Sequence, residues 1–158
     1  VRTRLGPAAT GVRANLFAVE SVDPPVLGVD RWGYDGGNGL RSTRKFRPGD
    51  TTFDRAIEGE AHYVPDVAEL PKNEKPGRGY KSFSTYPVAS DDRLFGILTI
   101  DAPGAEDITP FDVKLLGFFA GVIALSFSSQ QDCPYVPMGN LSVPCDTGTE
   151  GEEVGSHD

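Results

Sequence analysis

The chain has 158 residues and a formal net charge of −8, which fits one globular domain with an acidic surface. This acidity argues against a duplex nucleic-acid partner, because phosphate contacts need clustered Lys and Arg. Two cysteines and two histidines are too few for a disulfide scaffold or a structural zinc site. The longest near-apolar run, Leu115 to Phe127, is shorter than the roughly 20 residues that span a bilayer. We therefore expect no membrane insertion within this chain.

The first half of the chain reads as strands and turns. Residues 12–19 and 26–34 are rich in strand formers. The Gly-rich stretch at 35–39 predicts a tight turn, and residues 40–47 are expected to return as a third strand. Residues 1–11 contain two glycines and a proline and no apolar signal-peptide core, so we expect an N-terminal extension and a cytoplasmic location, with tethering through upstream segments left open.

A short helix and a hairpin follow. Thr51 or Thr52 can cap a short helix that ends near Ile57. Residues 61–67 predict a short extended segment that Pro65 restricts to an edge or a strand end. Residues 82–89 and 94–101 predict two strands joined by a tight turn.

The most distinct helix is expected from Pro110 to about Ser128. Thr109 precedes it, Pro110 takes its first position, and Asp112 stands three residues after the cap, which is typical of a capping box. From Leu115 onward the helix is apolar nearly all round. One side can pack on a sheet, so the other needs a second helix or a partner subunit.

The order of elements predicts an α+β domain over residues 12–131, in which helices cover one face of an antiparallel sheet. Residues 132–158 contain glycines, prolines and glutamates with few large apolar side chains. We expect them to form a flexible acidic tail.

The late part of this pattern resembles the GAF domain family. Residues 82–127 read as a strand with a proline near its end, a polar hairpin, a Gly-apolar strand that ends on Asp, an acidic loop and a long apolar helix. Gly96, Asp101, Thr109 and Asp112 fall at the family's positions. The resemblance continues more weakly over 12–67 and implies a GAF-like, PAS-related α+β fold. The long N-terminal helix usual in the family is missing or shortened here, because residues 1–11 do not favour a helix.

The resemblance also implies a regulatory sensor with a pocket between the sheet and the shorter helix. By position, the residues expected to line this pocket are Trp32, Tyr34, Phe53, Tyr63, Tyr86 and Thr99. Aromatic walls with a few polar anchors suit a small ligand. The alternative is that these aromatic side chains fill a closed core without a ligand.

The rival function is a protein-interaction module without a ligand. It would use the helix at 110–128 to dock a partner or to form a homodimer. The residues expected at such an interface are Leu115, Phe119, Val122 and Ile123.

No catalytic residue is expected. Some enzymes that resemble GAF domains reduce free methionine sulfoxide with cysteines in the domain body, whereas Cys133 and Cys145 follow the last helix. A disulfide between these two cysteines is a minor alternative to free thiols. His62 could ligate haem, but an ordinary, partly exposed strand residue is the favoured interpretation. The sequence requires no cofactor and predicts no metal site; it also lacks the family's cyclic-nucleotide motif and a cysteine for bilin attachment.

Overall fold

The computed structural model describes residues 11–36, 42–72, 74–75 and 79–139, with the backbone alone for residues 30–36. These residues form seven strands, two α-helices and a 3-10 turn. The elements are β1 (Arg13–Val22), β2 (Pro25–Gly36), β3 (Lys45–Phe46), α1 (Thr51–Ile57), β4 (His62–Val64), η1 (Val67–Glu69), β5 (Ser82–Ser90), β6 (Arg93–Ala102), α2 (Pro110–Ser128) and β7 (Val136–Pro137).

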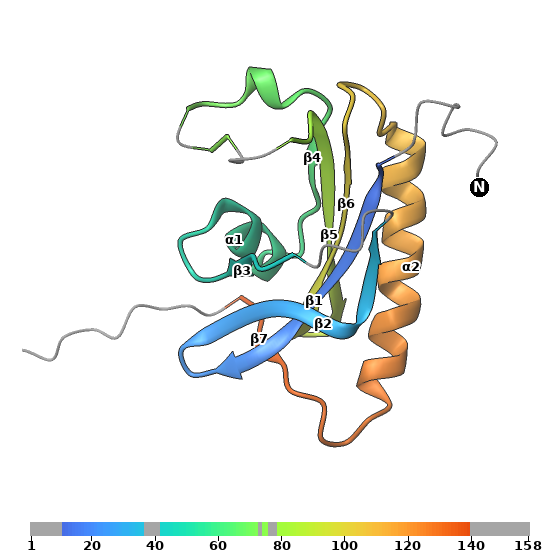
Figure 1. The fold of residues 1–158 in the computed structure, drawn as a ribbon. Helices are drawn as coiled ribbons and strands as arrows, with labels where there is room; N and C mark the ends of the chain where they lie inside the picture. The colour runs from blue at the N-terminus through green and yellow to red at the C-terminus, as the bar shows by residue number, and fades with distance from the viewer. Residues whose placement is uncertain (1–10, 37–41, 73, 76–78, 140–158) are drawn as a thin grey trace, which may run out of the picture.

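The strands form one antiparallel sheet in the order β3-β2-β1-β6-β5-β4, and β7 pairs with the first residues of β6. Figure 1 shows the sheet edge-on between two layers, with α2 along one face and α1 on the other. The predicted antiparallel α+β architecture is confirmed. The expectation that the helices share one face is wrong, because the apolar side chains of the two helices enter separate clusters.

Each face of the sheet has its own core. On the α1 face, Phe17 of β1 and Ile97 of β6 belong to one buried cluster with Phe53 of α1. On the α2 face, Leu16 and Phe95 belong to a second cluster with Ala120 and Ala124. Neighbouring residues of β1 thus serve opposite cores, as the alternation of side chains along a strand requires.

A β-bulge adjusts this alternation in β6. Val88 pairs with Gly96 and Ala89 pairs with Leu94, which leaves Phe95 as an extra residue in β6. The extra residue places Leu94 in the α1 cluster and Phe95 in the α2 cluster. Next to it, a Cβ at Gly96 would collide with the carbonyl oxygen of Phe17, so β1 and β6 approach closely only because this residue is glycine.

The local signals at the hairpin and the long helix were sufficient to predict both. Ser90 pairs with Arg93 across a two-residue turn in which Asp91 has a φ of 56°. At α2, the Thr109 hydroxyl accepts from the Asp112 N–H and the Asp112 carboxylate accepts from the Thr109 N–H, so the capping box is present. Both features depend on residues close together in sequence.

Two predicted boundaries are corrected. The third strand was expected over 40–47, but β3 contains Lys45 and Phe46 alone among the described part of that range. The tail was expected from residue 132, yet β7 pairs Val136 with Leu94 and buries the Val136 side chain in the α1 cluster. The structured domain therefore extends past Gln131 to this strand, because one apolar side chain after a turn completes the core.

Helix α2 is, among the described residues, the one helix whose length and composition would suffice to cross a membrane. In this structure it lies along β5 and β6 and buries Leu116, Ala120 and Ala124. A helix that covers one face of a core meets the same criteria of length and composition.

Candidate functional site

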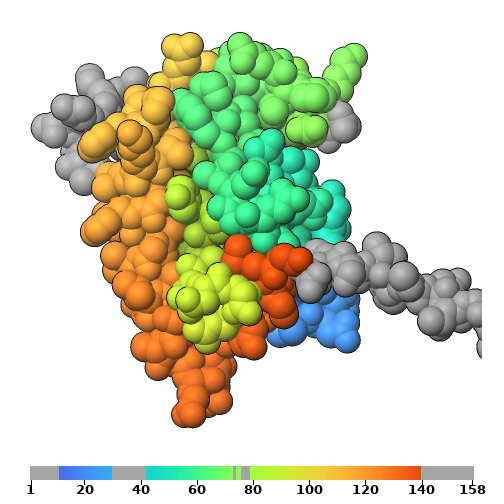
Figure 2. All heavy atoms as spheres, turned by 180° about the vertical axis from the view of Figure 1, so that it is seen from behind, coloured from blue at the N-terminus to red at the C-terminus, as the bar shows by residue number. Residues whose placement is uncertain are grey.

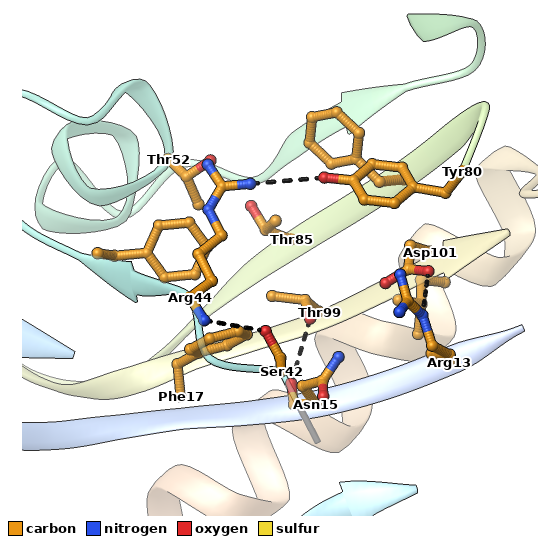
Figure 3. Close-up of a pocket in the computed structure, with 13 residues that line it drawn as sticks. Arg13, Asn15, Phe17, Ser42, Arg44, Thr52, Tyr80, Thr85, Thr99 and Asp101 are labelled. Carbon is orange, nitrogen blue, oxygen red and sulfur yellow. Dashed lines mark hydrogen bonds and ion pairs between the residues drawn. The ribbon is translucent and has the colours of Figure 1, made fainter. Parts of the chain in front are cut away.

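A small polar cavity lies on the α1 face, over β1, β6 and β5. Its volume is about 80 Å³, and its walls include Asn15, Thr52, Thr85 and Thr99. Figure 3 shows that these polar side chains approach the same space from three strands and from the start of α1. We call it the inner cavity.

Asn15 is the most buried polar group of the inner cavity. The residue is 4% exposed, and its side-chain oxygen Oδ1 has no hydrogen-bond partner. Its backbone carbonyl is not free, since the Thr99 hydroxyl donates to it at 3.4 Å. A buried polar atom without a partner destabilises the fold by about 1–3 kcal/mol.

One end of the inner cavity is closed by an ion pair. The Nε atom of Arg13 donates to Asp101 Oδ1 at 2.8 Å, and the two residues pair across β1 and β6. Burial raises the pKa of Asp101 above its usual value, and the hydrogen bond and charge of Arg13 offset only part of that effect. Asp101, a residue of the predicted motif, thus contributes to the wall of the cavity.

At its mouth stands a second guanidinium. The Arg44 side chain reaches over the Phe46 ring, 4.5 Å from its centroid, and Nη1 donates to the Tyr80 hydroxyl at 3.4 Å. Burial raises the pKa of Tyr80, although the neighbouring Arg44 lowers it in part. Arg44 and Tyr80 come from segments far apart in sequence and meet above the inner cavity (Figure 3).

Outside this pair lies a larger hollow of about 450 Å³, which we call the outer bowl. It shares Arg44, Thr52 and Tyr80 with the inner cavity and adds charged and polar groups, including Asp50, His62, Glu74 and Lys75. The shared residues make the two hollows neighbours, with the Arg44 and Tyr80 side chains at their boundary.

His62 lies in the wall of the outer bowl and is 8% exposed, with no hydrogen-bond partner for its Nδ1 atom. Its ring meets the Phe83 ring edge-on at 5.1 Å. Burial, followed by the charge of Arg55, lowers the pKa of His62 below 6.5. The expectation of a partly exposed residue is wrong, because β4 turns this side chain inward.

The six predicted ligand-binding residues do not form one group. Thr99 lines the inner cavity, and Phe53 is fully buried in the core next to Thr52. Tyr63 donates its hydroxyl to the Ile108 carbonyl at 2.7 Å and so links β4 to the loop before α2. Tyr86 packs on the opposite face, where a Cβ at Gly117 would collide with its ring. The side chains of Trp32 and Tyr34 lie outside the described residues.

The polar residues of the inner cavity were not predicted from the sequence, although the sequence pattern around Asn15 indicates one of them. Asn15 interrupts an apolar strand two positions before Phe17, so the period of the strand already places it on the Phe17 face. A polar residue at such a position is a candidate for a site. No comparable signal marks Arg44 or Tyr80, because only the folded chain brings them together.

The GAF domain family matches residues 12–127. The chain belongs to the GAF domain family. A search of curated proteins gives no match.

Solved structures share the GAF fold with this chain. A structure titled as that of the GAF domain has a TM-score of 0.61 and 22% identity, over 76% of this chain and 66% of that chain, so our chain spans just under two thirds of it. A type II free methionine-R-sulfoxide reductase from Thermoplasma acidophilum has a TM-score of 0.56, with 17% identity over 75% and 79% of the two chains. Residues 122 to 287 of a methyl-accepting chemotaxis protein have a TM-score of 0.59, with 15% identity over 74% and 77%.

The side of α2 that faces away from the sheet carries exposed apolar side chains. Of the four predicted interface residues, Phe119 and Val122 are each 47% exposed, whereas Leu115 and Ile123 are half-buried. Prediction missed Phe118 and Leu125, which are 65% and 68% exposed. In Figure 2, α2 forms one whole side of the molecule.

The described thiol of this GAF domain lies away from the cavity. Cys133 packs against the cluster on the α2 face, and burial raises the pKa of its thiol. Cys145 lies outside the described residues. Among the described residues, no group of three or more His, Cys, Asp and Glu side chains could hold a metal ion.

Proposed function

We propose that this GAF domain is a regulatory sensing module that binds a small molecule at the inner cavity and the outer bowl. The observation that carries the proposal is the buried Asn15 side chain, which belongs to the wall of the inner cavity and whose Oδ1 atom lacks a hydrogen-bond partner. Most buried polar side-chain atoms in folded proteins have a hydrogen-bond partner. A ligand that hydrogen-bonds to the Asn15 side chain would supply such a contact.

The inner cavity alone is small for a ligand, since pockets for small molecules usually measure about 300–1,000 Å³. The outer bowl, at about 450 Å³, falls in that range. The ligand would therefore place one end in the inner cavity and its larger part in the bowl. The Arg44–Tyr80 pair must then move or accept a contact from the ligand.

A non-catalytic role is part of the proposal. A sulfoxide reductase that depends on cysteine needs its thiolate beside the substrate. Cys133 lies on the other face of the sheet from the inner cavity, and its pKa is raised rather than lowered. A cytoplasmic location remains a prediction.

Native mass spectrometry tests ligand binding. The chain, purified gently or incubated with a metabolite extract, should carry a reproducible excess mass that unfolding removes. Thr99→Leu would fill the inner cavity and should abolish this excess. Ser21→Leu, at the far end of β1, is the matched control and should retain it. A bare chain in every preparation would contradict the proposal and favour a module without a ligand.

A homodimer through α2 is the second candidate function. The specific observation is the row of exposed apolar side chains Phe118, Val122 and Leu125 on one helix. Exposed apolar patches on a folded domain mark interaction sites. Dimerisation and ligand binding are compatible, because the two surfaces lie on opposite faces of the sheet.

A further inference from the structure

The chain crosses from one face of the sheet to the other shortly after α2. Cys133 packs against the cluster on the α2 face, whereas Val136 and Met138 lie at the cluster on the α1 face. Between them, β7 pairs with the first residues of β6. Figure 2 shows this segment at the surface, between α1 and the β5–β6 turn. We call residues 133–138 the strap, because they join the α2 side of the domain to its α1 side.

The strap is held by a two-residue strand and by a few side chains, of which Met138 is one. The Met138 N–H donates to the Asp92 carbonyl at 2.7 Å, and its half-buried side chain packs against the α1 cluster. Its terminal methyl group lies 3.5 Å from the point where a Cβ would stand on Gly59, just after α1. The second apolar anchor is Val136, which is 2% exposed. Met138 therefore joins the strap to the turn that ends α1.

Two sulfur atoms belong to the strap, and their chemistry differs. A thiol reacts with an oxidant as its thiolate, and burial raises the pKa of the Cys133 thiol. A thioether has no proton to lose, so the reaction of Met138 with an oxidant does not depend on ionisation. Its side chain is half-buried rather than enclosed, so a small oxidant can reach it. Met138, the one methionine of the sequence, is therefore the more oxidisable of the two residues.

We propose that Met138 is a site of reversible oxidation by hydrogen peroxide, and that its sulfoxide releases the strap from the α1 face. In this step the thioether sulfur attacks one peroxide oxygen. The S–O bond forms, the O–O bond breaks, and the second oxygen leaves as water with both hydrogens. The sulfur loses two electrons and the peroxide gains them. Methionine sulfoxide reductases reverse the product to the thioether, so the modification can act as a switch.

The sulfoxide weakens the strap because it changes an apolar group into a polar one. Its oxygen would lie against the apolar α1 cluster, and burial of a polar group without a hydrogen bond is unfavourable. The two-residue β7 ladder offers little resistance to local opening. When the strap opens, Val136 leaves the cluster that it shares with Phe53 and Ala56 of α1. Oxidation would thus loosen the α1 face, and this inference holds whether or not the inner cavity binds a ligand.

Hydrogen exchange measured by mass spectrometry on the whole chain tests the proposal. Hydrogen peroxide should add one oxygen to Met138 in the folded chain, as peptide fragmentation would locate. Peptides that cover the strap should then exchange faster by roughly tenfold or more. Peptides from α2 should exchange as before, because α2 packs on the other face of the sheet.

Two variants at the same position separate oxidation from other effects of peroxide. Met138→Leu keeps an apolar side chain and both cysteines but has no thioether, so its strap should stay protected before and after peroxide. Met138→Gln places a polar group at this position and should exchange as fast as the oxidised wild type without any peroxide. If Met138→Gln does not fold, the comparison of wild type with Met138→Leu still decides the matter.

The proposal is overturned if Met138 stays unoxidised in the folded chain, or if its sulfoxide leaves the exchange of the strap unchanged. Equally fast exchange in peroxide-treated Met138→Leu would assign the effect to the cysteines and overturn it as well. Methionine sulfoxide reductases of both epimer specificities should restore slow exchange in the oxidised wild type. If they remove the oxygen and the strap still exchanges fast, Met138 is not a reversible switch.

Discussion

At the scale of single residues, the sequence is informative where a signal is local. Thr109 and Asp112 are three positions apart, so their capping box follows from the sequence alone. Arg44 and Tyr80 come into contact only in the folded chain, and the local sequence around either residue does not predict this hydrogen bond. The candidate site was therefore predicted in part, through Thr99, while most of its polar wall was not.

His62 leads to a prediction at this scale. Its pKa in the folded protein lies below 6.5, chiefly because of burial. The unfolded chain then binds more protons below a pH of about 6.5, so the free energy of unfolding should fall as the pH drops through that value. Above it the imidazole is neutral in both states, and the effect vanishes.

Chemical denaturation at pH 8, 7, 6 and 5 measures this effect for wild type and His62→Gln. Carboxylates titrate in both proteins and cancel in the difference. The wild type should lose stability relative to the variant below about pH 6.5. A difference that is constant with pH would contradict an inward, neutral His62.

At the scale of elements, strands and helices with strong periodicity were predicted to within a few residues, and so was the short helix α1, whereas the bounds of β3 and the existence of β7 were not. The β5–β6 hairpin and α2 agree closely with their sequence patterns. Strand β7 contains just Val136 and Pro137, too short for any periodicity. Its stability comes from pairing with Leu94 and from burial, both of which depend on residues distant in sequence.

Val136→Ala tests whether β7 belongs to the fold in solution. The Val136 side chain is buried in the core on the α1 face, so the loss of two methyl groups should lower the free energy of unfolding by about 2 kcal/mol. Pro137→Ala is the control, because Pro137 is exposed beside it, and it should change stability by about 0.5 kcal/mol or less. Equal, negligible effects in urea denaturation would mean that this segment is detached, as the sequence analysis expected.

At the scale of the whole molecule, the sequence pattern posed a question that the fold answers in part. An apolar surface nearly all round α2 predicts cover on two sides. The sheet supplies one side, through Leu116, Ala120 and Ala124. The other helix cannot supply the second, since α1 lies across the sheet (Figure 1). Composition fixes how much apolar surface a helix has, but only the placement of its neighbours decides how much remains open.

A second copy of the chain would cover the open side of α2. Phe119→Glu with Val122→Glu introduces two carboxylates where each wild-type residue is 47% exposed, and a buried unpaired charge destabilises an interface strongly. The double variant should run as a monomer in light scattering coupled to size exclusion, while wild type runs as a dimer. Ile123 is a poorer choice for this test, because it packs against the core on the α2 face.

Ala68→Glu with Thr51→Glu is the matched control: it adds the same charge at exposed positions outside α2 and should remain dimeric. Circular dichroism must show that both double variants stay folded. A wild-type monomer at tens of micromolar, or a dimer that survives Phe119→Glu with Val122→Glu, would remove α2 as the interface. The row of Phe118, Val122 and Leu125 would then need a different protein to cover it, because water remains an unfavourable neighbour for so much apolar surface on one helix.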